Sequence, residues 1–233
     1  MKRLSKMIRA ITFGAALFGA ATCFAEIDMV AGPMRAEGDF NLDKSTRRSL
    51  SGIACPVTAD GRHICLVAFD EGVEARTIEI GDDLYAVHGK PVKIGVEDTE
   101  MDSEAVAADD QYYYVTGSHA NKRKHCAENG SSHRVVRIAY DQSTGLPLRK
   151  DGRLKQIDDD YDLAKDLPNA LQDAIGKCLG SNGGGLDIEG LAVYDGHLYF
   201  GLRGPTKIDP ASDHRSIVSV RRSRFRVVER EEL

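Results

Sequence analysis

Two stretches of the chain, LDIEGLAVYDGHLYF at residues 186–200 and MDSEAVAADDQYYYV at residues 101–115, repeat one pattern 85 residues apart. The pattern is Asp-x-Glu followed by a small residue, an aliphatic residue and Ala, then a turn and a strand that contains tyrosine. A third, degraded copy without the acids, SGIACPVTADGRHICLVAF, begins at Ser51. Self-similar segments of this length predict a fold built from repeated structural units.

Each copy opens a unit of about four predicted strands, separated by turn dipeptides such as Asp195-Gly196. The predicted strands are 51–55, 62–69, 75–80 and 91–95, then 104–108, 112–117, 134–140 and 152–157, then 189–194, 197–202, 215–220 and 225–229. Repeated four-stranded units are typical of β-propeller blades. The sequence therefore predicts an all-β, β-propeller-like fold with about three visible blades. A sandwich or barrel also uses short strands, but would not explain the repeated acidic motif.

One helix is expected to interrupt these strands, at residues 160–177. Its apolar residues Leu163, Leu167, Leu171 and Ile175 are spaced four apart and form a single stripe. At the other end of the chain, 27–31 is a candidate for one more strand. Closed propellers have at least four blades. The chain is therefore expected either to be a fragment of a longer propeller, with a truncated or altered end at 221–233, or to need a partner to close, since an open ring would self-associate.

The first 25 residues have the features of a secretory signal peptide. Lys2, Arg3, Lys6 and Arg9 precede an uncharged run, 10–25, that ends Cys23-Phe24-Ala25 with small residues at the cleavage positions. The run is short and rich in Gly and Ala, which disfavours a stable membrane anchor. These features predict a signal peptide at 1–25, a domain at 26–233, and a periplasmic or secreted protein.

Removing the signal peptide takes four cations from 31 and leaves 27 basic against 36 acidic residues, a net charge of −9. Such a surface repels nucleic acid and suits a cation. Four cysteines remain, and an even number in an exported chain predicts two disulfides. Cys55 and Cys65 flank the turn at Asp60-Gly61, which pairs them and leaves Cys126 with Cys178.

The segment GLDIEGLAVYDGHLYFGLRGP (185–205) resembles a family of secreted bacterial proteins carried as a domain of unknown function. That family is marked by an Ile-Glu-Gly-Leu-Ala strand followed by Gly-Leu-Arg-x-Pro, and DSEAVA…YYYVTGSH (102–119) fits it too. The resemblance covers roughly residues 50–205. The family is similar at a distance to phytase-like esterase propellers, which implies a propeller fold without a settled reaction.

In a propeller blade the first strand begins, and the second strand ends, at the same face. This places Asp102 and Glu104 beside Ser118 and His119, and Asp187 and Glu189 beside Arg203. The first unit contributes Asp70 and Glu71. Carboxylates converging on a channel are suited to calcium, and an arginine to a phosphate or carboxylate. The candidate metal ligands are Asp102, Glu104, Asp187 and Glu189, and the candidate ligand-binding residues are Glu104, His119, Glu189 and Arg203.

Two alternatives stay open for these residues. Glu104 and Glu189 could instead bind neighbouring blade backbones, and Arg203 could form a structural ion pair with Glu189. A zinc site at His119, His125 and His133 is disfavoured, because the adjoining cations at 122–124 would repel the ion.

These features predict an exported domain that binds a metal ion, a small anionic ligand or a protein partner at its channel face. The alternative is a calcium-dependent phosphoesterase or esterase of the phytase-like type. The chain has no GxSxG elbow and no complete catalytic constellation. The sequence therefore leaves open whether the protein is an enzyme.

Overall fold

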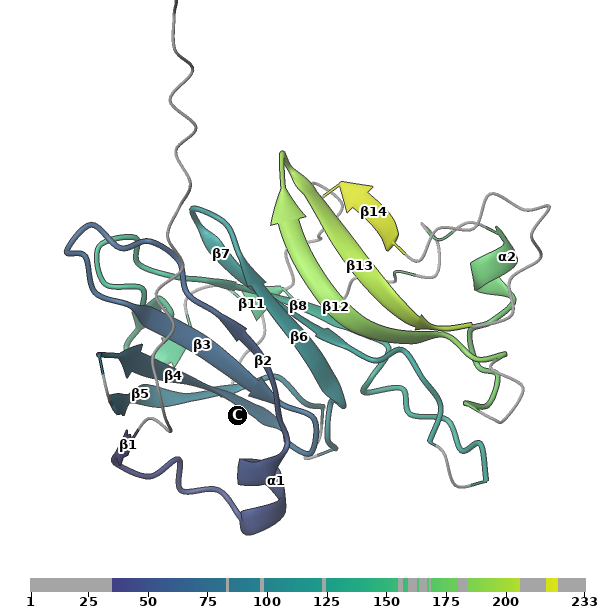
Figure 1. The fold of residues 1–233 in the computed structure, drawn as a ribbon, viewed down its shortest axis with the longest axis horizontal. Helices are drawn as coiled ribbons and strands as arrows, with labels where there is room; N and C mark the ends of the chain where they lie inside the picture. The colour runs from purple at the N-terminus through teal and green to yellow at the C-terminus, as the bar shows by residue number, and fades with distance from the viewer. Residues whose placement is uncertain are drawn as a thin grey trace, which may run out of the picture. The chain divides into compact units, whose positions relative to one another are not determined.

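In the first sheet four strands lie side by side in chain order, and the first described strand of the chain is added at the outer edge, beside the last of them (Figure 1). The computed structural model describes residues 35–82, 84–96, 99–122, 125–154, 157–158, 163, 167, 169–179, 184–205 and 217–221, all within one unit. The strands of the first sheet are antiparallel, apart from the first, which pairs parallel with β5. In spatial order they are β1 (Arg35–Glu37), β5 (Leu84–Lys93), β4 (Glu74–Ile80), β3 (Ile64–Phe69) and β2 (Leu50–Ala54).

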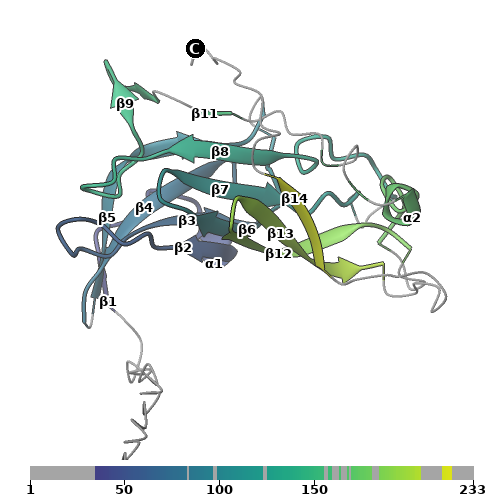
Figure 2. The ribbon, with the colours of Figure 1, turned by 90° about the horizontal axis from the view of Figure 1, so that it is seen from above.

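The second and third sheets are also antiparallel and sequential. Figure 2 shows β7 between β6 and β8. The second sheet has the order β11 (Ile157–Asp158), β8 (Val135–Ala139), β7 (Tyr112–Gly117), β6 (Ser103–Ala108), and the third has β12 (Asp187–Tyr194), β13 (His197–Gly204), β14 (Ile217–Arg221). The protein is therefore predominantly β, as predicted. The described strands include no further sheet between β12 and β2.

The innermost strands of the three sheets lie side by side, with β6 between β2 and β12 (Figure 1). Hydrogen bonds cross both junctions. The Ser51 hydroxyl donates to the Ser103 carbonyl, and the Ile188 N–H donates to the Ser118 carbonyl at 2.9 Å. The junctions therefore fix the ends of the inner strands relative to one another.

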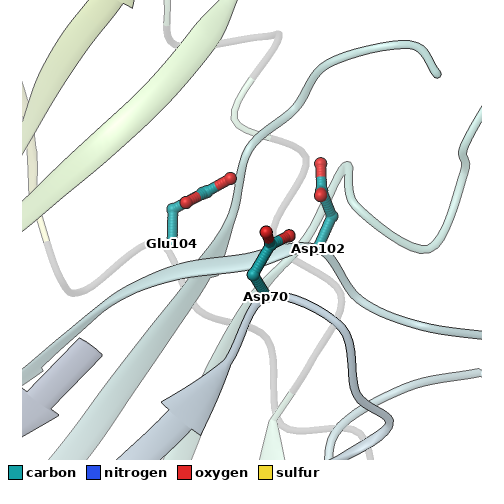
Figure 3. Close-up of side chains that lie close together, drawn as sticks. All are labelled: Asp70, Asp102 and Glu104. Atoms are coloured by element: carbon teal, nitrogen blue, oxygen red, sulfur yellow. The ribbon is translucent and has the colours of Figure 1, made fainter. Parts of the chain in front are cut away.

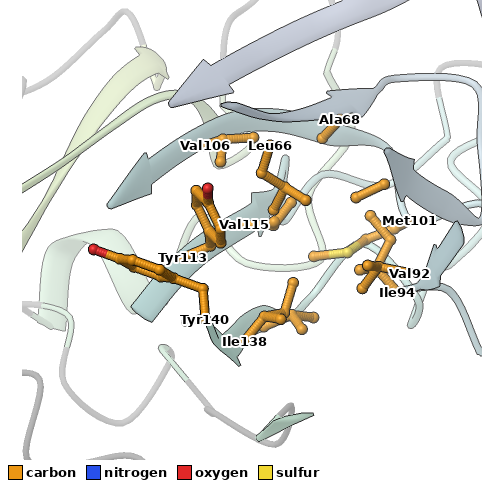
Figure 4. Packing of buried hydrophobic residues seen from close by; sticks show 12 residues of the cluster. Leu66, Ala68, Val92, Ile94, Met101, Val106, Tyr113, Val115, Ile138 and Tyr140 are labelled. Carbon is orange, nitrogen blue, oxygen red and sulfur yellow. The ribbon is translucent and has the colours of Figure 1, made fainter. Parts of the chain in front are cut away.

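Three apolar clusters hold the sheets. The cluster between the first and second sheets includes Leu66, Met101, Val106 and Tyr113 (Figure 4). A second cluster joins the second and third sheets through Tyr114, Val135, Ile188 and Phe200, among others. The third lies on the far face of the first sheet, where Phe40 packs edge-on against Phe69 and stacks on Tyr85.

The helix expected at 160–177 is shorter at its C-terminal end. In the described residues α2 is Asn169–Gln172, and the chain continues as turns to Gly176, whose φ of +75° lies outside the helical region. Most of 160–168 lies outside the described residues. The apolar stripe is nevertheless buried, since Leu163, Leu167 and Leu171 are at most 3% exposed.

The fourth strand expected in the second unit, 152–157, is also wrong. Asp151 and Gly152 both have positive φ and form a tight turn, so that Arg153–Leu154 (β10) folds back on Arg149–Lys150 (β9) as a separate hairpin. The fourth strand of the second sheet is instead β11, which pairs with β8. The expected segments 1–25, 27–31 and 225–229 lie outside the described residues.

The helix α1 (Lys44–Arg48) was not expected from the sequence. Asp43 caps it, accepting hydrogen bonds from the N–H groups of Ser45 at 2.8 Å and Thr46 at 3.1 Å. The structure contains both predicted disulfides, Cys55–Cys65 and Cys126–Cys178. No helix in the described part of the chain is long and apolar enough to cross a membrane.

Candidate functional site

Each inner strand has a β-bulge at the same position of the repeat. Regular pairing with the second strand of the sheet is interrupted around Ser51 on β2, Glu104 on β6 and Glu189 on β12. A bulge re-aims the side chain of the extra residue, and bulges are common beside functional sites. The two glutamates of the repeat motif are therefore set apart from the regular alternation of their strands.

The ends of the first two strands are also equivalent between units. The Asp70 N–H donates to the Ser49 carbonyl at 2.8 Å, and the Ser118 N–H donates to the Asp102 carbonyl at 2.9 Å. These bonds join the residue after the second strand to the residue before the first. Both ends therefore lie at one face, as the sequence predicts for the acidic motifs.

Three carboxylates meet at this face, Asp70 from the first sheet and Asp102 and Glu104 from the second (Figure 3). One oxygen from each lies within 4.8 Å of the others, and all three residues are partly buried. The Ser118 hydroxyl donates a hydrogen bond to Asp102 Oδ2 and accepts one from the Ala120 N–H at 3.1 Å. These three residues, Asp70, Asp102 and Glu104, are called the acid group below.

Crowding makes the charged form of the acid group unfavourable. Burial, followed by the hydrogen bond to and repulsion from Asp102, raises the pKa of Asp70 to about 7. Burial, followed by repulsion from Glu189 and Asp70, raises the pKa of Glu104 to about 8. A bound cation would remove the repulsion, since opposite charge favours the ionised carboxylate.

The acids of the third sheet are held differently. Arg203 donates to Asp187 Oδ2 from Nε at 2.6 Å and from Nη2 at 2.5 Å, and its Nη1 pairs with Glu189 Oε1. The Asp187 side chain is 3% exposed, and its Oδ1 is buried without a hydrogen-bond partner. Burial raises the pKa of Asp187, although Arg203 opposes the rise. The predicted ligand set is thus divided. Asp102 and Glu104 belong to the acid group, whereas Asp187 and Glu189 form an arginine-bound pair with Arg203.

His119 lies apart from the acid group. It is 4% exposed, its Nδ1 is 3.0 Å from the Gly117 carbonyl oxygen, and its ring stacks on His133 with centroids 6.0 Å apart. Ser118 contacts Asp102, whereas His119, whose φ is +57° and therefore lies outside the extended region, has its ring buried against His133. Within the described residues no group of metal-ligating side chains includes these histidines, and Cys126 is in a disulfide.

The sequence places Asp70 at this face but gives no reason to rank it above Glu71. In the structure Glu71 is exposed and outside the acid group, whereas Asp70 belongs to it. A positive φ at Asp102, +55°, orients the segment that carries Asp102. Neither this turn nor the bulges has a clear sequence signal.

The raised pKa values predict a stability that falls as pH rises. The folded chain binds protons more tightly than the unfolded chain at Asp70 from pH 3.8 to about 7 and at Glu104 from pH 4.5 to about 8. We expect the midpoint of thermal unfolding, measured by circular dichroism in the presence of chelator, to decrease as the pH is raised from 6.5 to 8.5. The decrease per pH unit should be smaller in Glu104→Gln. Burial lowers the pKa of His133 from its ordinary value of 6.5, so below that pH this residue makes stability rise with pH.

The matched control for this measurement is Glu71→Gln, which removes an adjacent carboxylate outside the acid group. It should change the slope less than Glu104→Gln does, because repulsion from Glu71 contributes less to the raised pKa of Asp70 than burial and Asp102 do. A midpoint whose pH slope is the same in Glu104→Gln would contradict the role given to the acid group.

Comparison with known proteins adds a family. The chain matches the model of a family described as a protein of unknown function (DUF3616) at residues 67–146 and 146–208, which is more than half of the chain. No curated protein and no solved structure matches it. The match spans the acid group and the arginine-bound pair. The chain belongs to the DUF3616 family.

Proposed function

We propose that this protein is an exported β-propeller-type domain that binds calcium through Asp70, Asp102 and Glu104. The observation that carries the proposal is the acid group itself, in which carboxylates from two sheets approach within 4.8 Å. Calcium prefers six to eight oxygen ligands at about 2.3–2.6 Å. Ligands on opposite sides of the ion are then about 5 Å apart, which suits this spacing.

The propeller architecture is supported by the sequential sheets and by the order of the inner strands, β2, β6 and β12. Export is supported by the two disulfides, which persist in oxidising compartments. The finer resemblance to phytase-like propellers stays a prediction.

The acid group leaves room for a second ligand on the ion. Three carboxylates supply at most six oxygens, and fewer when each binds through one, so water or a small anion would complete the coordination. Ser118 is held at Asp102 and would keep that carboxylate oriented. We therefore propose that a small anionic ligand binds through the ion.

The ion pairs of Arg203 favour binding over the phosphoesterase alternative. A phosphate would have to compete with Asp187 and Glu189, which already contact Nε, Nη1 and Nη2 of Arg203 and offset its charge. Turnover of phosphoesters that is lost in Glu104→Gln would establish the alternative.

Calcium should raise the thermal midpoint of the protein. At 100 times its dissociation constant a ligand stabilises the folded state by about 2.7 kcal/mol. For a chain of this size that corresponds to a rise of about 5–10 °C. Differential scanning fluorimetry with calcium and with chelator measures it. Asp70→Asn and Glu104→Gln should each remove most of the rise, because each takes away a carboxylate that faces the ion.

Glu71→Gln is again the control, since it makes the same chemical change one residue from Asp70. It should retain the full calcium response. A midpoint that neither calcium nor chelator moves would overturn the proposal.

A further inference from the structure

The contact between β2 and β6 shows how the first strands of two neighbouring sheets pack against each other. A Cβ added at Gly52 would lie 2.7 Å from the Val106 nitrogen and 2.8 Å from the Ala105 carbonyl carbon. Val106, on the other side of the contact, is 6% exposed. Two features thus make one junction: a position without a side chain on the earlier strand, and an aliphatic side chain on the later strand.

The register of the sheets gives every unit an equivalent pair of positions, with a small residue at the first, where alanine stands in the second unit in place of glycine. Each follows the bulge directly: Gly52, Ala105 and Gly190 come first, and Ile53, Val106 and Leu191 come second. Successive residues face opposite sides of a strand. The first set therefore faces the following sheet and the second set faces the preceding one. Leu191 packs on the cluster between the second and third sheets, as this rule requires.

Among the described strands, half of this junction is left at each end of the series of sheets. On β12, a Cβ at Gly190 would meet only the Gly201 backbone, at 3.5 Å or more. The surface there is a shallow, open depression lined by Glu189, Gly190, Gly201, Leu202 and Arg203. On β2, Ile53 is 46% exposed, although Phe40 covers the outer part of the same sheet. The two halves are complementary.

We propose that a second copy of this chain closes the ring, with β2 of each copy beside β12 of the other. A twofold axis forms both junctions at once, because β2 of the first copy meets β12 of the second and β12 of the first meets β2 of the second. Two copies supply six sheets, which lies within the four to eight blades of known propellers. This inference rests on the proposed propeller architecture and is independent of calcium.

Charge supports a second copy as the occupant. Helix α1 immediately precedes β2 and has Lys44, Arg47 and Arg48, all exposed. Glu189 lies at the same end of its inner strand, beside the depression. Asp187 and Glu189 outnumber Arg203, which contacts both, so this end of β12 is net negative. In the dimer the basic helix of one copy approaches this end of β12 in the other, and the opposite charges favour the pairing.

Light scattering coupled to size exclusion, on the chain purified after export, tests the proposal. We expect twice the monomer mass at micromolar concentration, in calcium and in chelator alike. Gly190→Leu should give a folded monomer, since the added side chain has room in one copy but blocks the approach of β2 from another. Ile53→Asp should do the same. Gly130→Leu, at an exposed glycine with nothing within 4 Å of its Cβ position, should remain dimeric.

A monomer at 100 µM would overturn the inference. So would a dimer that both variants leave intact, and so would a ladder of larger open assemblies, because it would mean that the junction does not close after two copies. A calcium response that fails while the dimer persists would instead overturn the proposed function alone.

Discussion

Replacing Gly52 by valine should destabilise the protein by about 3 kcal/mol or more, which is the upper range for overpacked sites. The Cβ would approach three backbone atoms of β6, at 2.7 to 2.9 Å from Val106 and Ala105. Backbone cannot rotate away as a flexible side chain can, so β2 and β6 must separate. Urea unfolding followed by circular dichroism measures the loss.

The same variant should weaken the calcium response, because Asp70 lies on the first sheet and Asp102 and Glu104 on the second. Gly130→Val is the control, since that glycine is exposed with open space around its Cβ position. It should change stability by less than about 1 kcal/mol. A Gly52→Val protein as stable as its parent would show that the inner strands are farther apart than described.

The second large effect is expected from Tyr113→Ala. The tyrosine is fully buried between the first two sheets, its ring centroid is 4.8 Å from that of Tyr140, and its hydroxyl donates to the Gly145 carbonyl at 2.7 Å. Truncating a buried aromatic residue to alanine typically costs about 3–5 kcal/mol. Urea unfolding with Val57→Ala, at a side chain that is 96% exposed, as control measures this loss.

Tyr113→Phe separates packing from hydrogen bonding in that effect. It keeps the ring but leaves the buried Gly145 carbonyl without this donor, at a cost of about 1–2 kcal/mol. If the phenylalanine variant were as unstable as the alanine variant, the hydroxyl and not the packing would be the main contribution of Tyr113.

The sequence is a good guide where a short periodic pattern decides the structure. Strand 112–117 is predicted to the residue, because three tyrosines and Val115 form a clear run between two turns. The first half of β5 was missed, since Leu84–Lys93 is a largely exposed strand with a mixed pattern. Its pairing depends on β4, which lies beside it in space, and a local pattern does not contain that information.

The candidate site was predictable as a face but not as a set of contacts. The repeat places Asp102, Glu104, Asp187 and Glu189 at one end of their strands, where the structure also has them. The division between them depends on Arg203, which binds the acids of the third sheet. That division follows from the third dimension, in which Asp70 of the first sheet lies within 4.8 Å of Asp102 and Glu104.

The bulges at Ser51, Glu104 and Glu189 separate the chemistry of this face from the packing beneath it. In a regular strand, side chains alternate between the core and the solvent. A shift of one position therefore moves every later side chain to the opposite face of the sheet. An extra residue that is left out of the pairing is not constrained by this alternation. Its side chain is free to change from hydroxyl to carboxylate, as it does between the first and second sheets, while the apolar residues behind it keep their places. The same fold can therefore carry different ligand-binding side chains at this face. Substitutions at the bulge positions can change the binding specificity without disrupting the core.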